Sequence, residues 1–234
     1  MKNTRLFITL FGVLLVVAFP GISQAQFRLD LFGAGNFPQS KDFEISVPQS
    51  TVPLKGTHEF SVGARGGVRL GYDGRGHWGQ DFVYSYGSNA SRIINHTNSA
   101  QYSISNRIHQ ISYNGLWYPG GLSGKKKVFP YLTAGVGGTI YAVTQSAIND
   151  ALDPNRGGIG RLRTEGLFSF NAGAGIRIRV NSLYGFRIDV RDHISRPVRY
   201  GLPRSSSDPK ATVFPVTGIF NQIEVSFAFV YYFR

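Results

Sequence analysis

Residues 219–234, IFNQIEVSFAFVYYFR, end the chain and alternate between two kinds of side chain. The apolar set comprises Ile219, Ile223, Val225, Phe227, Phe229, Tyr231 and Phe233, with Asn221 as a polar exception. The intervening positions include Gln222, Glu224, Ser226, Ala228 and Arg234. Because successive side chains of a β-strand point to opposite faces of the sheet, this segment is predicted to be a strand with one apolar face.

The same alternation recurs in seven segments further upstream. These are residues 27–31, 60–70, 78–86, 102–113, 131–142, 168–180 and 184–195. In residues 102–113 the phase of the apolar positions changes between Ile108 and Ile111, which predicts a β-bulge. We therefore predict an all-β fold with eight antiparallel strands in one domain, residues 26–234.

Long and short connections alternate between these segments. The long ones are residues 37–56, 89–100, 145–165 and 196–216, and the short ones are residues 73–76, 119–127 and 181–183. Transmembrane β-barrels have long loops on the outer side and short turns on the periplasmic side. The alternation predicts an up-and-down transmembrane β-barrel with both termini in the periplasm.

The N-terminal residues have the pattern of a cleaved secretory signal peptide. Lys2 and Arg5 precede an uncharged apolar run from Leu6 to Phe19, and a small-residue stretch ends at Ala25. The alternative, a single transmembrane helix, needs about 20 apolar residues, more than this run supplies. We therefore predict a signal peptide at residues 1–25 and export of the mature chain.

The composition restricts the partners of an exported protein. The chain has 25 Lys and Arg residues against 13 Asp and Glu residues, and removal of the signal takes away two basic residues and no acidic one. Such a surplus favours anionic partners. For an exported chain we expect lipopolysaccharide phosphates and no nucleic acid, with a soluble basic surface as the alternative. The chain has no cysteine, which excludes disulfides and a lipid-modified cysteine.

Alternation alone leaves open whether the apolar face meets lipid or a soluble core, as in a lipocalin-like barrel or a periplasmic sandwich. The polar face carries several glycines that suit the narrow interior of an eight-stranded barrel. They are Gly63, Gly67, Gly135, Gly137, Gly173 and Gly175. Aromatic residues near segment ends suggest a membrane-interface girdle, with ordinary core aromatics as the alternative. They are Trp78, Trp117, Tyr118, Tyr131, Tyr184, Tyr231, Tyr232 and Phe233.

The chain end resembles the aromatic-terminated last strand of outer-membrane β-barrel proteins. Residues 129–137, 170–175 and 185–192 are also similar to strands of the small OmpA/OmpX-type barrels, a porin-like family of Gram-negative bacteria. The resemblance covers the mature chain and implies an outer-membrane location. It also implies that the outer-membrane assembly machinery recognises Phe229, Tyr231 and Phe233. Arg234 departs from the usual ending because it follows the last aromatic residue.

If the polar faces point inward, the lumen collects many charged side chains. They are Arg28, Arg65, Arg69, Arg177, Arg179, Arg187 and Arg191, with Asp30, Asp81, Asp189 and Glu224. Unpaired charges in so narrow a space cost on the order of several kcal/mol each. We therefore predict a salt-bridge network that fills the barrel. The alternative is a narrow pore in which the excess of arginine favours anions.

An enzymatic alternative rests on His193-Ile194-Ser195. The segment is similar to the His-x-Ser pair of outer-membrane lipid A deacylases, which implies a serine activated by a histidine. Alternation turns both side chains toward the lumen, however, and Arg196-Pro197 stand where that family carries Asn-Ala. We therefore expect no enzymatic activity.

The remaining sequence predicts neither a metal nor a cofactor. The five histidines lack the close spacing of metal ligands. The four long loops are left as the surface for a structural or binding role, and their partner is not identified by the sequence. We expect the barrel to be a monomer that contacts outer-membrane lipid.

Overall fold

The computed structural model describes residues 26–45, 54–74, 76–97, 101–122, 126–153, 159–208 and 212–233. The predicted signal peptide, residues 1–25, and Arg234 lie outside these ranges. The strands are β1 (Gln26–Pro38), β2 (Lys41–Ile45), β3 (Leu54–Phe60), β4 (Gly63–Asp73), β5 (Trp78–Asn95), β6 (Gln101–Trp117), β7 (Val128–Val143), β8 (Glu165–Arg179), β9 (Tyr184–Ser195) and β10 (Phe220–Tyr232). A short helix, α2 (Gln145–Leu152), follows β7. Within these ranges, no helix has the length and hydropathy needed to cross a membrane.

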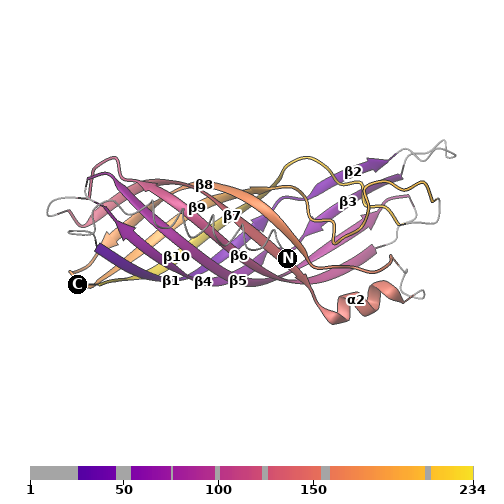
Figure 1. The fold of residues 1–234 in the computed structure, drawn as a ribbon, viewed down its shortest axis with the longest axis horizontal. Coiled ribbons are helices and arrows are strands. Elements are labelled where there is room, and N and C mark those ends of the chain that lie inside the picture. Colours follow the sequence, from indigo (N-terminus) through magenta and orange to yellow (C-terminus); the bar gives the residue numbers. More distant parts are fainter. Residues whose placement is uncertain are drawn as a thin grey trace, which may run out of the picture.

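Eight strands form a closed antiparallel barrel (Figure 1). Their order around the barrel is β1, β4, β5, β6, β7, β8, β9 and β10. The circle closes where β10 pairs with β1, with Arg28 opposite Tyr232. The predicted eight-stranded up-and-down barrel is confirmed.

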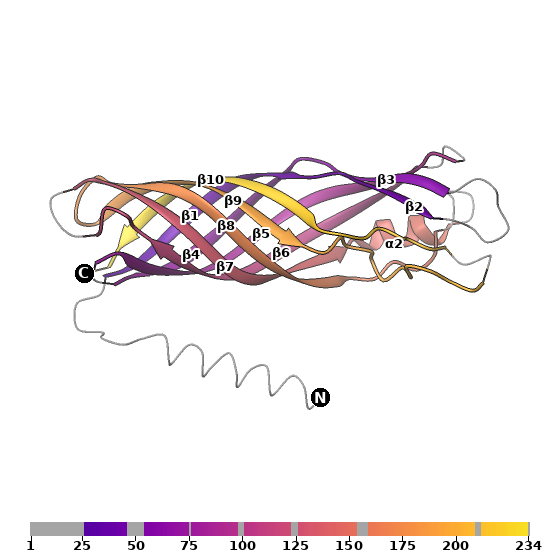
Figure 2. The ribbon, with the colours of Figure 1, turned by 90° about the horizontal axis from the view of Figure 1, so that it is seen from above.

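The two ends of the barrel differ, as Figure 2 shows. The C-terminal end of β10 lies at one end, together with the short links between β4 and β5, β6 and β7, and β8 and β9; we call this the turn end. The hairpin of β2 and β3 lies at the other end with α2, and we call this the loop end. The connections predicted to be short lie at the turn end, and the connections after β1, β7 and β9 are long, but the link between β5 (to Asn95) and β6 (from Gln101) is shorter than predicted.

The β2–β3 hairpin lengthens one side of the wall at the loop end. β3 pairs with β5 beyond the part of β5 that pairs with β4, so that Phe60 lies opposite Ser91 and Ala64 lies opposite Ser88. β3 and β4 therefore follow each other along β5 like one interrupted strand. At the interruption the Ser61 N–H bonds to the carbonyl of Ala90 at 2.9 Å.

Strands β5 and β6 are longer than the alternation predicted. They contain 18 and 17 residues and pair without a break from Trp78↔Trp117 to Ile94↔Gln101. Most of the predicted loop at residues 89–100 is therefore strand. The predicted bulge is wrong, because Ile108 points inward and Ile111 points outward on one regular strand. The apolar phase changes because the inside of the barrel becomes apolar near the loop end.

The outer face of the barrel is apolar and the inner face of its middle part is polar. Leu31 and Phe227 are 53% and 54% exposed, whereas the inward Asp30 and Ser226 beside them are buried. Glycines allow the walls to approach closely. A Cβ atom at Gly173 would collide with the carbonyl oxygen of Val190 on the neighbouring strand. This arrangement matches the predicted inward polar face.

Aromatic residues at the turn end divide into two groups. Trp78, Trp117, Tyr184 and Phe233 are exposed on the outer face, and Tyr231 there is half-buried. Three others that were predicted to belong to the same girdle are buried inside the barrel: Tyr118, Tyr131 and Tyr232. Proximity to a strand end does not determine which face a side chain occupies. Tyr131 and Tyr232 have the inward phase of their strands, and Tyr118 continues the inward phase of β6 one residue beyond its end.

The loop end is closed by an apolar cluster that we call the cap. Its buried members are Phe60, Ile93, Ile104, Ile108, Tyr141, Ala147, Ala151, Ile159, Leu162, Leu167, Val198, Tyr200, Leu202, Phe214, Val216 and Phe220. They come from the barrel wall, from α2 and from the segments that follow α2 and β9. The long connection after β9 thus packs into the barrel mouth.

Candidate functional site

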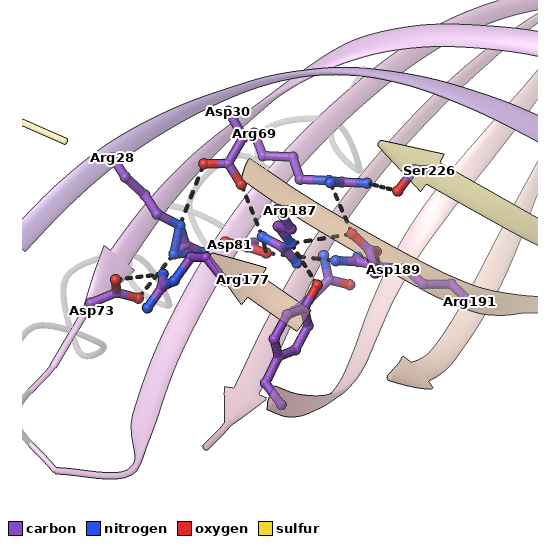
Figure 3. Close-up of polar contacts among 12 residues, drawn as sticks. Arg28, Asp30, Arg69, Asp73, Asp81, Arg177, Arg187, Asp189, Arg191 and Ser226 are labelled. Carbon is purple, nitrogen blue, oxygen red and sulfur yellow. Dashed lines mark hydrogen bonds and ion pairs between the residues drawn. The ribbon is translucent and has the colours of Figure 1, made fainter. Parts of the chain in front are cut away.

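A chain of ion pairs crosses the lumen in the half nearer the turn end (Figure 3). Arg177 Nη1 lies 2.6 Å from Asp73 Oδ2, and Arg28 Nη1 lies 2.9 Å from Asp73 Oδ1. Arg28 Nη2 also pairs with Asp81 Oδ1, and 2.8 Å separates Asp81 Oδ2 from Arg187 Nη1. All five side chains are buried and come from five different strands. The chain therefore ties opposite parts of the wall together.

Arg187 occupies the centre of this network. Besides Asp81, its Nη1 lies 3.0 Å from Asp30 Oδ2, and its Nε lies 3.2 Å from Asp189 Oδ2. The Nε group also donates a hydrogen bond of 2.6 Å to the hydroxyl oxygen of Tyr131. One guanidinium thus contacts three carboxylates and a phenol. Arginine suits this role because its planar group carries five N–H donors and stays charged.

Asp189 extends the network toward the loop end. Its Oδ1 accepts a hydrogen bond of 2.6 Å from Arg191 Nε, and its Oδ2 lies 3.1 Å from Arg69 Nη1. Arg69 also donates to Ser226 Oγ at 2.8 Å, and its guanidinium carbon lies 3.9 Å from the ring centre of Phe32. Aromatic packing against a desolvated guanidinium adds a favourable cation–π contact.

The charges of this network nearly balance. Its members are Arg28, Arg69, Arg177, Arg187 and Arg191 with Asp30, Asp73, Asp81 and Asp189. The sequence pattern predicts that Asp73 lies in a turn. It has the same inward phase as Arg69 on β4, a signal that places it in the lumen. Its two ion pairs reduce the arginine excess that had suggested an anion pore.

A second polar layer lies between this network and the cap. Arg65 donates to Gln110 Oε1 at 2.6 Å and to Gln222 Oε1 at 2.7 Å, and it lies 3.6 Å from Glu224 Oε2. His193 lies between Gln110 and Glu224, with its Nε2 3.9 Å from Glu224 Oε2. Gln222 also bonds to the hydroxyl of Tyr141, which belongs to the cap. The layers are therefore connected.

Arg179 takes no part in these layers among the described contacts. It is half-buried at the turn end, where its Nη2 donates to Gln26 Oε1 at 2.7 Å. Its guanidinium carbon lies 4.4 Å from the ring centre of Tyr232. The other ten charged residues predicted for the lumen are buried inside the barrel.

The chain matches known proteins by structure and not by sequence. No protein-family model and no curated protein matches the chain. The outer membrane protein OprG from Pseudomonas aeruginosa superposes with a TM-score of 0.56 at 12% identity, over 90% of this chain and 96% of that one. This chain is an outer-membrane-type eight-stranded β-barrel. Neisserial surface protein A is also similar, with a TM-score of 0.49 at 15% identity over 90% of this chain and 100% of that one.

The last strand of this outer-membrane-type barrel presents its predicted residues on the outer face. Phe229 and Phe233 are exposed, and Tyr231 is half-buried against the ring of Tyr184 at 5.7 Å. Within the barrel wall β10 pairs on both sides, with β9 and with β1. The aromatic side chains, and not the backbone of this strand, are therefore accessible from the membrane.

One acidic side chain lies on the lipid-facing surface. Asp192 follows the apolar outward residues Ile188 and Val190 on β9, and its Oδ2 accepts a hydrogen bond of 3.1 Å from Asn221 Nδ2. Asn221, the exception in the alternation of the last strand, is thus explained by a partner on the neighbouring strand. The pair lies near the loop end of β9 and β10.

The two residues of the His-x-Ser pair have separate partners among the described contacts. His193 is buried in the lumen, and Ser195 Oγ donates to the carbonyl of Arg196 at 3.0 Å. The described contacts of His193 are with Gln110 and Glu224 and not with Ser195.

Proposed function

We propose that this outer-membrane-type barrel is non-conducting and has a structural or binding role carried by its loop end. The observation that supports the proposal is the charged network around Arg187. It joins β1, β4, β5, β8 and β9 across the lumen, and the polar layer and the cap lie between it and the loop end. Moving an ion through the barrel would require breaking several buried ion pairs. Breaking one is costly, because it leaves a buried charge without the partner that offsets its desolvation.

Planar-bilayer recording tests this proposal. Purified protein, refolded in lipid and inserted into the bilayer, should give no discrete current steps in potassium chloride at any holding voltage. A general porin inserted in the same bilayers provides the positive control. Reproducible steps from this protein would contradict the proposal.

A second candidate is the narrow pore. Several lumen atoms have no hydrogen-bond partner among the described residues, including both amide atoms of Asn171 and Nη2 of Arg191. Such groups are suited to a solvated path. Current steps with anion preference, reduced by Arg191→Gln, would support this candidate over the filled barrel.

We propose lipopolysaccharide as the anionic contact of the loop end. Arg92 and Arg107 are exposed on the outward face of β5 and β6, where the strands extend toward the loop end. We expect Arg92→Gln with Arg107→Gln to reduce the amount of lipopolysaccharide that co-purifies in native mass spectra. Equal retention by this variant and the wild type would contradict the assignment. The same spectra should contain a monomer.

For assembly, we propose that the outer-membrane machinery recognises Phe229, Tyr231 and Phe233. We assign no enzymatic activity, because His193 and Ser195 lack a shared hydrogen bond in the described contacts. Lipid A incubated with the purified barrel should keep its mass. Loss of an acyl chain would contradict this assignment.

A further inference from the structure

His58 is an unusual residue at the centre of the cap region. It lies on β3 and is 0% exposed. Its ring packs against Phe60, Tyr200 and Phe214, with ring-centre distances of 4.3, 6.2 and 4.9 Å. Neither ring nitrogen has a hydrogen-bond partner in the part of the chain that the structure describes. Burial of the ring without hydrogen-bond partners costs much more free energy when the imidazole is charged than when it is neutral.

The charged groups around His58 do not favour its protonation. Lys41 on β2 lies directly opposite His58 in the strand register. The acidic residues of the hairpin, Asp42, Glu44 and Glu59, have the opposite phase and point away from the cap. On β5, the residue opposite His58 is Ile93, and from the connection after β9 the Tyr200 phenol and the Phe214 ring face it. Burial therefore lowers the pKa of His58 to about 3.

The aromatic contacts of His58 join two separate parts of the cap. Tyr200 belongs to the connection after β9, and its hydroxyl contacts Ser91 Oγ and Asn106 Nδ2, each at 2.8 Å. Phe214, from the far part of the same connection, packs edge-on against Phe43 of β2 at 5.6 Å. His58 thus lies where the β2–β3 hairpin meets both arms of this connection.

We propose that His58 is an acid-sensitive latch that holds the connection between β9 and β10 in the barrel mouth. In the closed cap the imidazole is neutral and surrounded by aromatic rings. Opening brings the ring into water, where it takes up a proton at mildly acidic pH. Acid therefore favours the open cap, and this inference does not depend on whether the lumen conducts.

Proton linkage gives the direction and the size of the effect of pH on cap opening. The open state holds more protons than the closed state between pH 6.5, the ordinary pKa of histidine, and about 3. Closure is therefore fully favoured above pH 6.5 and weakens as the pH falls. Each unit of pH below about 6.5 shifts the opening equilibrium about tenfold. At pH 5.0 the shift is about 30-fold.

Hydrogen exchange in lipid nanodiscs tests the latch. The backbone N–H groups of Leu202 and Phe214 bond within the connection, to the carbonyls of Arg199 and Pro203 at 3.0 and 2.7 Å. After correction for the intrinsic pH dependence of exchange, their protection should fall about 30-fold between pH 7.5 and pH 5.0. In His58→Phe this fall should disappear. Amides in the β7–β8 wall provide the internal reference.

Two further variants separate the latch from other titrating groups. Glu165 accepts a hydrogen bond of 2.7 Å from the Arg199 N–H and is a second charged contact of this connection. Glu165→Gln removes its charge and should leave most of the pH response in place. His109→Phe changes a histidine on the outer face, beside Tyr84, and should have no effect on the response.

Three results would overturn the proposal. They are pH-independent protection in the wild type, an unchanged response in His58→Phe, and loss of the response in Glu165→Gln alone. If His58→Phe does not fold, the wild type provides the test. Its His58 ring resonance should remain that of a neutral imidazole in the closed state at pH 5.0. A resonance that titrates near pH 6.5 while the amides stay protected would exclude the latch.

Discussion

At the scale of single residues, Arg187 is the most connected group in the lumen. Its guanidinium contacts the carboxylates of Asp30, Asp81 and Asp189. The side chain is buried, so water cannot take the place of a lost carboxylate. Removing one partner from a buried ion-pair network leaves the others uncompensated. We expect Arg187→Met to lower the free energy of unfolding by about 3–5 kcal/mol. Urea titration in lipid vesicles, followed by the gel migration of the folded barrel, measures this loss.

Arg196 provides the matched control for Arg187. Its side chain is 60% exposed at the loop end and lies 3.4 Å from Glu165. Exposed ion pairs contribute about 0–1 kcal/mol, so Arg196→Met should change the unfolding free energy by no more than that. An equal decrease in the free energy of unfolding in the two variants would mean that the lumen network contributes no more to stability than an exposed ion pair.

Asp192 leads to a prediction of opposite sign. Charged side chains on the lipid face of a transmembrane barrel destabilise it, by up to about 1 kcal/mol near the interface. Asp192→Leu should therefore stabilise the folded barrel by up to about 1 kcal/mol. The same urea titration measures it, with Asp192→Asn as the variant that retains a hydrogen-bond acceptor for Asn221. Destabilisation by Asp192→Leu would assign the Asp192–Asn221 pair a structural role.

Strand phase predicts which residues enter the lumen but not which of them pair. Arg28, Asp81 and Arg187 were all assigned inward from alternation, and all three are buried there. Their contacts depend on how far distant strands are shifted along each other, and a period of two carries no information about that shift. Asp73 was missed because its position beside a glycine turn outweighed its phase.

At the scale of elements, β6 shows how the surroundings change the meaning of an apolar residue. Ile108 faces the cap and Ile111 faces outward, three residues apart on a regular strand. A sequence pattern records only that both are apolar. Since the inner face changes from polar to apolar along the strand, the pattern resembles a bulge. The predicted loop at residues 89–100 was wrong for a related reason, because this hairpin extends beyond the lipid-facing part of the wall with serines outward.

Glycines in the wall give a test at the same scale. Gly173 on β8 has the Val190 carbonyl oxygen of β9 where a Cβ atom would stand. A valine there must push β8 and β9 apart, whereas at Gly33 on β1 nothing lies within 4 Å of the added atom. We expect Gly173→Val to lose on the order of 2 kcal/mol or more, as overpacked sites do. Gly33→Val should fold like the wild type, and the folded fraction on a gel measures both.

At the scale of the whole molecule, the charged network and the cap occupy successive parts of the barrel interior. Replacing residues 198–216 with a short Gly/Ser linker removes the cap contributions of that connection and leaves the Arg187 network intact. We expect this variant to fold and to remain non-conducting in planar bilayers. Current should require the further change Arg187→Ala with Asp81→Ala, which opens the centre of the network.

One outcome for the variant that lacks residues 198–216 would contradict this prediction. Channel steps from the loop variant alone would show that the ion pairs do not seal the barrel. The intact barrel should fractionate with the outer membrane and migrate faster on a gel before heating than after it. Recovery from the soluble periplasm would contradict the outward orientation of the apolar face.

The junction between β1 and β10 constrains how the barrel folds. Arg28 pairs with Tyr232, so the first and last strands of the sheet are neighbours. Such a pairing closes a loop of almost the whole chain, and the entropy of that closure makes folding slow. The wall cannot be completed until the last strand has been synthesised and delivered. A barrel with this topology therefore keeps an open edge on β1 until β10 pairs with it.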